Sequence, residues 1–219
     1  MFDTSLTELV TRWFPAAFFT FVASFYTARI LWLHRAGGAR RVEKRNLDGS
    51  FCAAHLTFRI LRVSIWVAAV ARAFYPPFDQ LLLPIAFLTT PTVMLAGDAL
   101  LVAALLWILY VHMSMGESWQ SGITHDAPLP LTTQGVFAHS RNPTFLGIMA
   151  GQLGFFLAVP SLFALICLIL GIWAIGVRVR KEEAYLSAVH GEAYRRYRSV
   201  TPRWFSLPGF RPTGGTDMR

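Results

Sequence analysis

Residues 143–177 read PTFLGIMAGQLGFFLAVPSLFALICLILGIWAIGV and decide the fold class, because they contain no Asp, Glu, Lys or Arg. A helix needs about 20 mostly apolar residues to cross a bilayer. Pro160 divides the stretch into two runs, 143–159 and 161–177, each just long enough to cross. The pattern therefore predicts a helical hairpin made of two membrane spans.

Three further apolar runs precede this hairpin, at Trp13 to Leu33, Phe51 to Phe74 and Ala96 to Met115. The stretch 78–94 is shorter and is broken by prolines, which is typical of an interfacial or re-entrant segment rather than a span. The chain is thus predicted to be all-α, a polytopic membrane helix bundle of about five transmembrane helices.

The composition supports the membrane class and excludes several others. Of the 219 residues, 54% are hydrophobic and 15% are charged, whereas a soluble domain carries about 25% charged residues. Two cysteines, Cys52 and Cys167, lie far apart in apolar stretches, so neither a disulfide framework nor a zinc site is expected, and no metal is predicted. Asp3 and Glu8 precede the first apolar run, which favours a retained span over a cleaved signal.

The basic residues are placed unevenly, which predicts the orientation. Segments 34–50, 115–142 and 178–219 hold 15 of the 20 Lys and Arg residues. With five spans these segments share one face, and the positive-inside rule then predicts an outer N-terminus and a cytosolic C-terminus. The net charge of +8 therefore favours membrane lipids, not nucleic acid, as a partner. In a bacterium the location would be the inner membrane.

The tail after the last span carries paired carboxylates. Arg178 and Glu182 are four residues apart and share a helix face. One interpretation is a basic juxtamembrane cluster with local ion pairs. The other is that Glu182 and Glu183 meet a cationic ligand at the membrane surface. The tail is predicted to bend at Gly191 and to continue as a short helix that ends near Pro202.

A second motif lies on the cytosolic loop. Asn142 and Pro143 fit a helix start, with Asn as the cap and Pro in the first turn. The positive end of that helix can hold a ligand carboxylate. An ordinary capped helix entry is an equally good interpretation of this motif alone.

Taken together, the motifs resemble the C-terminal signature of the isoprenylcysteine carboxyl methyltransferase and phospholipid methyltransferase superfamily. The similarity covers about Gly116 to Trp204, including Gly116 to Trp119, the Arg-Asn-Pro of 141–143, the hairpin, the paired glutamates and Tyr194 and Tyr197. It implies an integral membrane enzyme that uses S-adenosylmethionine to methylate a lipophilic or small acceptor, which carries a carboxylate, a thiol or an amine.

The resemblance also implies roles for individual residues. Arg178 matches an arginine implicated in catalysis, and Glu182 acts with it. Tyr194 and Tyr197 match tail aromatics that pack over the site, and both are expected to contribute to acceptor binding. The implied cofactor contacts are Gln134, Gly135, His139, Arg141, Asn142, Pro143, Gly147, Glu182 and Glu183.

This sequence departs from the family pattern at four positions. Val136 and Phe137 replace Pro and Tyr, Ala138 replaces a basic residue, and Phe145 replaces another Tyr. These changes remove hydroxyl groups but leave the backbone and carboxylate contacts in place. The domain division predicted from the resemblance is 1–115 for acceptor-side helices, 116–206 for the cofactor loop, hairpin and tail helices, and 207–219 for a flexible tail.

Charged residues inside the spans are costly, and they usually face the bundle interior or water. Arg59 and Arg62, with His55, either snorkel to the interface or form a cationic patch that orients an anionic acceptor. Arg72 and Asp98 are expected to pair near the opposite face.

Other residues offer a base or a packing surface. His112, Glu117 and His139 flank the cytosolic loop and are candidate bases. Gly147, Gly151 and Gly154 lie on one apolar run, and their spacing is typical of close helix packing.

Other functions remain open on the sequence alone. A phospholipid N-methyltransferase is the nearest alternative. NADPH-dependent sterol-type reductases share a similar C-terminal architecture, although they need more spans and a larger pocket. A membrane scaffold or transport accessory would use the basic tail as a lipid anchor, but it would leave the Arg-Asn-Pro and Glu-Glu motifs unexplained.

Overall fold

The computed structural model describes residues 4–35, 49–115 and 131–205, and it is all-α over these residues. The described part contains an isolated bridge between Pro84 and Ser161 but no sheet. The predicted flexible tail 207–219 and the Gly116 to Trp119 motif lie outside the described residues. The helices are α1 (Thr4–Arg35), α2 (Gly49–Phe74), α3 (Phe78–Leu81), α4 (Pro91–Ser114), α5 (Pro143–Ala158) and α6 (Leu162–Val200), with 3-10 turns η1 (Ala86–Leu88) and η3 (Gly135–Ala138).

Three helices are long and apolar enough to cross a membrane: α2 from Cys52, α4, and α6. The fourth apolar helix, α5, has 16 residues and is shorter than a usual span. The predicted multi-pass membrane class is therefore confirmed. Crossing by α1 and α5, which the count of five requires, stays a prediction.

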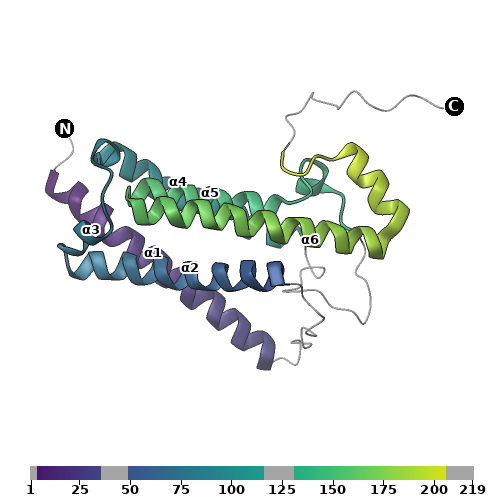
Figure 1. The fold of residues 1–219 in the computed structure, drawn as a ribbon, viewed down its shortest axis with the longest axis horizontal. Coiled ribbons are helices and arrows are strands. Elements are labelled where there is room, and N and C mark those ends of the chain that lie inside the picture. Colours follow the sequence, from purple (N-terminus) through teal and green to yellow (C-terminus); the bar gives the residue numbers. More distant parts are fainter. Residues whose placement is uncertain (1–3, 36–48, 116–130, 206–219) are drawn as a thin grey trace.

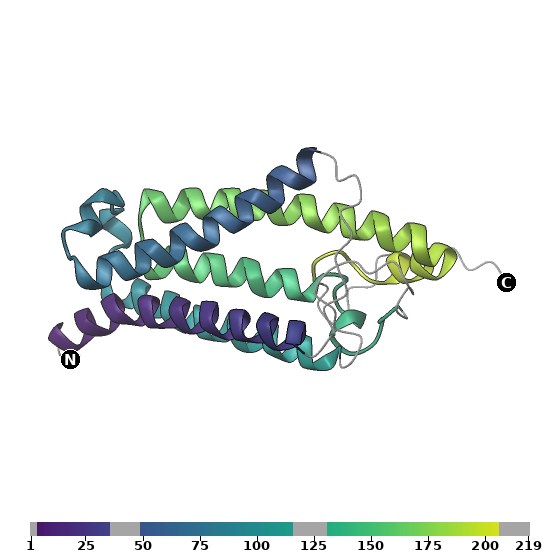
Figure 2. The same ribbon diagram turned by 90° about the horizontal axis from the view of Figure 1, so that it is seen from below.

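The long helices run roughly along the longest axis of the molecule (Figures 1 and 2). α4 packs on α5, α5 packs on α6, and α2 packs against both α1 and α6. The C-terminal end of α1 and the N-terminal end of α2 diverge in both views. At the same end of the bundle α6 bends at Gly191, which has a φ of 51°. The predicted bend at Gly191 is confirmed.

Glycines permit the close approach of α4 and α5. A Cβ on Gly147 would lie 2.6 Å from the Ile108 side chain, and one on Gly154 would lie 3.0 Å from the backbone nitrogen of Leu101. Small residues are the usual means of close packing between membrane helices. The packing role predicted for this glycine run is confirmed.

The proline-broken segment 78–94 does not form a sixth span. It contains the four-residue helix α3, the turn η1 and the start of α4 at Pro91, five residues earlier than predicted. Its backbone is tied to the α5–α6 turn, because Ile85 N–H donates to Pro160 O at 2.9 Å and Leu162 N–H donates to Leu83 O at 2.9 Å. The segment thus covers the end of the bundle opposite the Gly191 bend.

Arg72 and Asp98 interact electrostatically, as predicted, but they form no direct hydrogen bond. The direct hydrogen bonds go to Asp79: Arg72 Nε donates to Asp79 Oδ1 at 2.8 Å, and Arg12 Nη2 donates to Asp79 Oδ2 at 3.1 Å. Asp98 is buried, and its carboxylate oxygens have no hydrogen-bond partner within the described structure. Asp79 takes the contact because α3, which follows the turn after α2, lies directly against the end of that helix. Sequence spacing alone did not reveal this.

Replacing Asp79 by asparagine is expected to lower the melting temperature in detergent, because two arginines lose their carboxylate partner. Arg72 is buried, so the loss should reach about 1–3 kcal/mol of unfolding free energy. A matched control is Glu192→Gln, whose ion pair with Arg195 is 61% and 71% exposed. Equal melting temperatures for the two variants would contradict a stabilising role for Asp79.

Candidate functional site

A cavity of about 660 Å³ lies inside the bundle and is lined by α1, α2, α4, α5 and α6. Its walls are mostly apolar and aromatic, including Phe18 and Phe19 from α1, Leu101 from α4 and Phe155 from α5. Volumes of about 300–1,000 Å³ are typical of small-molecule sites. The cavity is therefore large enough for a lipophilic ligand.

Cationic side chains gather on this cavity. Arg59 and Arg62 come from α2, and Arg178 comes from α6 just after its apolar part ends at Val177. No Asp or Glu occurs among the described lining residues. Further polar groups in the lining are His112 at the end of α4, Thr144 at the start of α5, and Gln152 of α5. The structure thus joins two residues predicted for acceptor binding with the arginine predicted for catalysis.

Phe145 holds one face of Arg178. The guanidinium carbon of Arg178 lies 5.8 Å from the centre of the Phe145 ring, within the range of a cation–π contact. Glu182 lies one turn beyond Arg178, is exposed, and interacts electrostatically with it. Phe145 replaces a family tyrosine, and the ring alone suffices for this contact.

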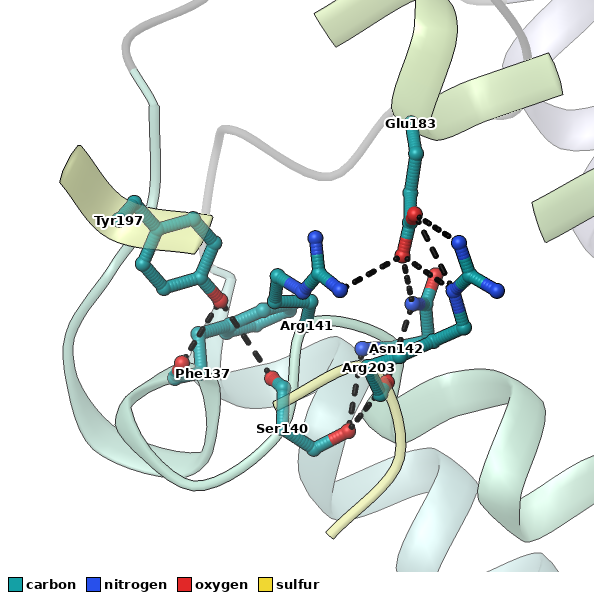
Figure 3. Close-up of polar contacts among 7 residues, drawn as sticks. All are labelled: Phe137, Ser140, Arg141, Asn142, Glu183, Tyr197 and Arg203. Carbon is teal, nitrogen blue, oxygen red and sulfur yellow. Dashed lines mark hydrogen bonds and ion pairs between the residues drawn. The ribbon is translucent and has the colours of Figure 1, made fainter. Parts of the chain in front are cut away.

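Glu183 is the centre of a polar network beside the cavity (Figure 3). Its carboxylate accepts hydrogen bonds from Asn142 Nδ2 at 3.1 Å and from Arg203 Nη2 at 2.8 Å. Arg141 Nη2 lies 3.6 Å from Glu183 Oε1. The network joins α6 beyond its apolar part, the start of α5 and the segment after α6.

The electrostatics of Glu183 follow from these contacts. Burial raises the pKa of the carboxyl, but the hydrogen bonds from Arg203 and Asn142 and the charge of Arg141 outweigh burial. The pKa of Glu183 therefore lies below its ordinary value. The carboxylate is ionised at neutral pH and balances the buried charge of Arg141.

A second set of bonds holds the loop to the tail (Figure 3). Tyr197 Oη donates to Phe137 O at 2.7 Å, and Arg141 N–H donates to Pro202 O at 3.0 Å. Ser140 Oγ accepts from Asn142 N–H at 3.1 Å. The 131–142 segment is thereby fixed against the end of α6, which fixes Thr144 at the edge of the cavity.

Three buried donor atoms in this region have no partner among the described residues: Arg141 Nε, Arg141 Nη1 and Tyr194 Oη. The Arg141 side chain is 8% exposed and Tyr194 is 1% exposed. An unmet buried donor costs about 1–3 kcal/mol, although the Arg141 guanidinium and the Tyr194 hydroxyl also interact with each other. These donors therefore fit the carboxylate of an amino-acid-bearing cofactor such as S-adenosylmethionine.

Asn142 occupies the N-cap position of α5 as predicted, but its side chain does not cap the helix. Pro143 occupies the first turn of α5 as predicted, but the Asn142 side chain makes no capping bond. It donates instead to Glu183 and to the carbonyl oxygen of Arg203 at 3.1 Å. These two bonds satisfy both amide hydrogens of the buried side chain.

The other predicted site residues differ in their exposure and in whether they line the cavity. Gln134, Gly135 and His139 are exposed around η3. Gly147 lies at the α4–α5 contact and also lines the cavity. Tyr194 and Tyr197 are buried and are not among the cavity-lining residues. The sequence interpretation missed Arg203. Its only signal was a basic residue beside the tail proline.

Fold and site together define a class: a multi-pass membrane helix bundle with an internal apolar cavity, cationic at one end and adjoined by a buried polar network. Comparison with known proteins is consistent with this class. Residues 93–188 match the model of the isoprenylcysteine carboxyl methyltransferase (ICMT) family. Over 78 residues the chain is 30% identical to a protein-S-isoprenylcysteine O-methyltransferase from Schizosaccharomyces pombe. That alignment covers 35% of this chain and 33% of the relative.

The chain thus spans about a third of the length of that relative. No solved structure matches. The segment that is similar to the isoprenylcysteine carboxyl methyltransferase family runs from α4 to the paired glutamates, less than half of the chain. The predicted resemblance to this family is confirmed for that segment.

Proposed function

We propose that this protein is an integral membrane methyltransferase that moves a methyl group from S-adenosylmethionine to a lipophilic or small acceptor in the α1–α6 cavity. The observation that carries the proposal is the contact of Asn142 with Glu183. This bond joins the two family motifs beside a cavity that Arg178 lines. Both motifs, with Arg178, lie within the family segment 93–188.

We propose that this methyltransferase has five membrane spans: α1, α2, α4, α5 and α6. Two observations support this count. Segment 78–94 folds at one end of the bundle without spanning its length, and the polar network lies beyond the apolar part of α6 at the other end. Since the basic part of α6 lies at the network end, the positive-inside rule makes that end cytosolic and the N-terminus external. Residues 1–115 then shape the acceptor side, and 116–206 hold the cofactor.

On the cofactor side, Arg141 and Tyr194 would bind the ligand carboxylate through their unmet donors. Glu182, exposed beside Arg178, supplies a negative charge for a cationic ligand. Glu183 positions Arg141 and Asn142 through its hydrogen bonds and ion pair. S-adenosylmethionine, when bound, supplies a methyl group on a sulfonium, which is a good leaving group.

On the acceptor side, the protein aligns the nucleophile and excludes water, which is the main contribution needed for an in-line displacement. The apolar walls of the cavity desolvate the acceptor. Arg178 would orient it at the boundary between the cavity and the network. An ionised carboxylate or thiolate needs no base, whereas an amine must lose a proton. For an amine, the imidazole of His112 on the cavity wall is placed to accept that proton.

Binding of S-adenosylmethionine and of NADPH to the purified protein in detergent tests the proposal. We expect saturable binding of S-adenosylmethionine and none of NADPH. Asn142→Ala and Glu182→Ala should each weaken the binding about 10-fold or more, because hydrogen bonds to charged groups contribute about 1.5–3 kcal/mol. Glu192→Ala, an exposed change on the tail, is the control.

Binding of NADPH in place of S-adenosylmethionine would favour a reductase, and binding of neither would contradict the methyltransferase proposal. Radioactive methyl transfer into membrane extracts then identifies the acceptor. It separates a carboxyl methyltransferase from a phospholipid N-methyltransferase by the product that carries the label.

A further inference from the structure

The chain that follows α6 is part of the polar network, although it lies outside the family segment 93–188. The carbonyl oxygen of Arg203 accepts a hydrogen bond from Asn142 Nδ2 at 3.1 Å and another from Ser140 Oγ at 3.4 Å. These bonds attach the segment after α6 to the loop that leads into α5. The similarity to the family therefore covers only part of the residues that build this site.

The side chain of Arg203 meets both carboxylate oxygens of Glu183 (Figure 3). Arg203 Nη2 donates to Glu183 Oε2 at 2.8 Å, and Arg203 Nε lies 3.1 Å from Oε1 and 3.2 Å from Oε2. A guanidinium that presents two nitrogens to a carboxylate fixes its direction as well as attracting it. The orientation of the Glu183 carboxylate is therefore set by Arg203.

The oriented carboxylate presents one oxygen to the loop. Glu183 Oε1 accepts a hydrogen bond from Asn142 Nδ2 at 3.1 Å and lies 3.6 Å from Arg141 Nη2. Asn142 is thus held by Arg203 in two ways, through the Glu183 carboxylate and through the Arg203 carbonyl. A change in the Arg203 side chain acts on the first contact and leaves the backbone contact in place.

The exposure of Arg203 separates this role from core packing. Its side chain is 40% exposed, whereas the side chain of Glu183 is 9% exposed. An ion pair with a partner this exposed contributes little to stability. The main effect of the Arg203 side chain is therefore expected on the position and charge of Glu183 and not on the stability of the fold.

We propose that Arg203 is a positioning residue for the cofactor: its guanidinium fixes the Glu183 carboxylate, which in turn holds Asn142 and Arg141 in place for S-adenosylmethionine. The inference deepens the proposed function and rests on it for the identity of the cofactor. Arg203 acts through Glu183 and is not assigned a contact with the cofactor or with the reacting atoms.

The proposed role has a consequence for the protonation of Glu183. Burial raises the pKa of the Glu183 carboxyl, and among the groups that lower this pKa the hydrogen bond from Arg203 has the largest effect. The titratable and charged side chains that interact with Glu183 are Arg141, Glu182, Tyr194, Tyr197 and Arg203. Without Arg203, burial is opposed by Arg141 and Asn142 only, so the pKa of Glu183 should rise.

The test is binding of S-adenosylmethionine to the full-length protein in detergent, measured by calorimetry from neutral pH down to about pH 4. Arg203→Gln should weaken binding about 10-fold at neutral pH, because hydrogen bonds to charged groups are strong. Binding should be lost as the pH falls through the pKa of Glu183 in the folded protein. For Arg203→Gln the midpoint of this loss should move up by about one pH unit.

Two further variants separate the role of Arg203 from general charge and from misfolding. Arg203→Lys keeps the charge but loses the two-nitrogen contact, so both effects should be intermediate. Arg196→Gln removes an arginine that is 82% exposed and should change neither the affinity nor the midpoint.

The melting temperature of the cofactor-free protein, followed over the same pH range, gives a second measurement. The stabilising contribution of Glu183 should be lost at a higher pH in Arg203→Gln than in the unaltered protein. Weaker binding with both midpoints unmoved would overturn the positioning role, because a purely structural loss leaves the protonation of Glu183 unchanged. If Arg203→Gln does not fold, Arg203→Lys with unchanged affinity and midpoints would overturn it equally.

The two proposals fail in different ways. Unchanged cofactor affinity in Arg203→Gln would overturn the role of Arg203 and leave the proposed function standing. Absence of S-adenosylmethionine binding in the unaltered protein would defeat the proposed function, while the melting measurements would still decide whether Arg203 controls Glu183.

Discussion

Replacing Glu183 by glutamine is expected to lower the unfolding free energy by about 2–4 kcal/mol, because breaking a buried ion pair from one side leaves uncompensated charge. Glutamine has nearly the same shape and can still accept a bond from Asn142. It cannot neutralise Arg141, which is 8% exposed, whereas Arg203 is 40% exposed and can turn to water. For a chain of this length the melting temperature should fall by about 5–15 °C.

The same substitution should also abolish binding of S-adenosylmethionine, because Arg141 and Asn142 lose the group that positions them. Glu192→Gln is the matched control, since it removes a carboxylate from exposed ion pairs of the same helix. Exposed pairs contribute about 0–1 kcal/mol. If both variants melted at the same temperature, the network in Figure 3 would have no stabilising role.

The effect of Glu183 should depend on pH. Its pKa is lowered in the folded protein, so its contribution is fully present above the ordinary pKa of about 4 in the unfolded chain. The contribution is lost as the pH falls through the lower, folded value. The difference in melting temperature between the unaltered protein and Glu183→Gln should therefore be constant near neutral pH and shrink below pH about 4. A difference that grew on acidification would contradict the assignment.

Replacing Gly97 by alanine is expected to be the most damaging single methyl addition in the bundle. A Cβ at Gly97 would lie 2.6 Å from the backbone carbonyl carbon of Leu157 and closer still to the Ala158 nitrogen. Backbone atoms cannot move aside as a flexible side chain can, so α4 and α5 must separate. Overpacking of this kind costs about 1–3 kcal/mol or more, and the cavity walls that both helices supply should shift with it.

Gly151→Ala is the matched control on the same interface. Its Cβ would lie 3.6 Å from the Ala104 Cβ, an ordinary contact, and alanine favours a helix over glycine by about 1 kcal/mol. Melting temperature and binding of S-adenosylmethionine should therefore fall for Gly97→Ala and hold or rise for Gly151→Ala. A stable, fully binding Gly97→Ala protein would show that the α4–α5 contact is looser than the structure indicates.

Local chemistry made much of this molecule predictable. The charge-free apolar runs on both sides of Pro160 predicted two helices and the membrane class, because runs of that length can cross a bilayer. Gly191 predicted the tail bend because glycine adopts a positive φ readily. The order of Arg141-Asn142-Pro143 and Glu182-Glu183 predicted the family, because these motifs combine residues with little local reason to occur together.

Contacts between distant residues were less predictable. The sequence suggested Asp98 for Arg72, but the turn after α2 brings Asp79 closer. It suggested that Asn142 caps α5, but Glu183 and the Arg203 carbonyl take its amide hydrogens. Arg203 itself was missed, because nothing in its neighbourhood signals a partner 20 residues away.

The sequence by itself determined which segments are helical and apolar, where the chain bends, and which family the segment from α4 to the paired glutamates resembles. Each of these depends on neighbouring residues or on a short motif. Only the tertiary structure decided which charges meet. It separated Glu183, buried in a network, from exposed Glu182, and it placed Arg59 and Arg62 on the same cavity as Arg178. The physical reason is that ion pairs and cavities depend on how helices far apart in the chain pack. A shift of one helical turn in that packing changes which charged residues meet.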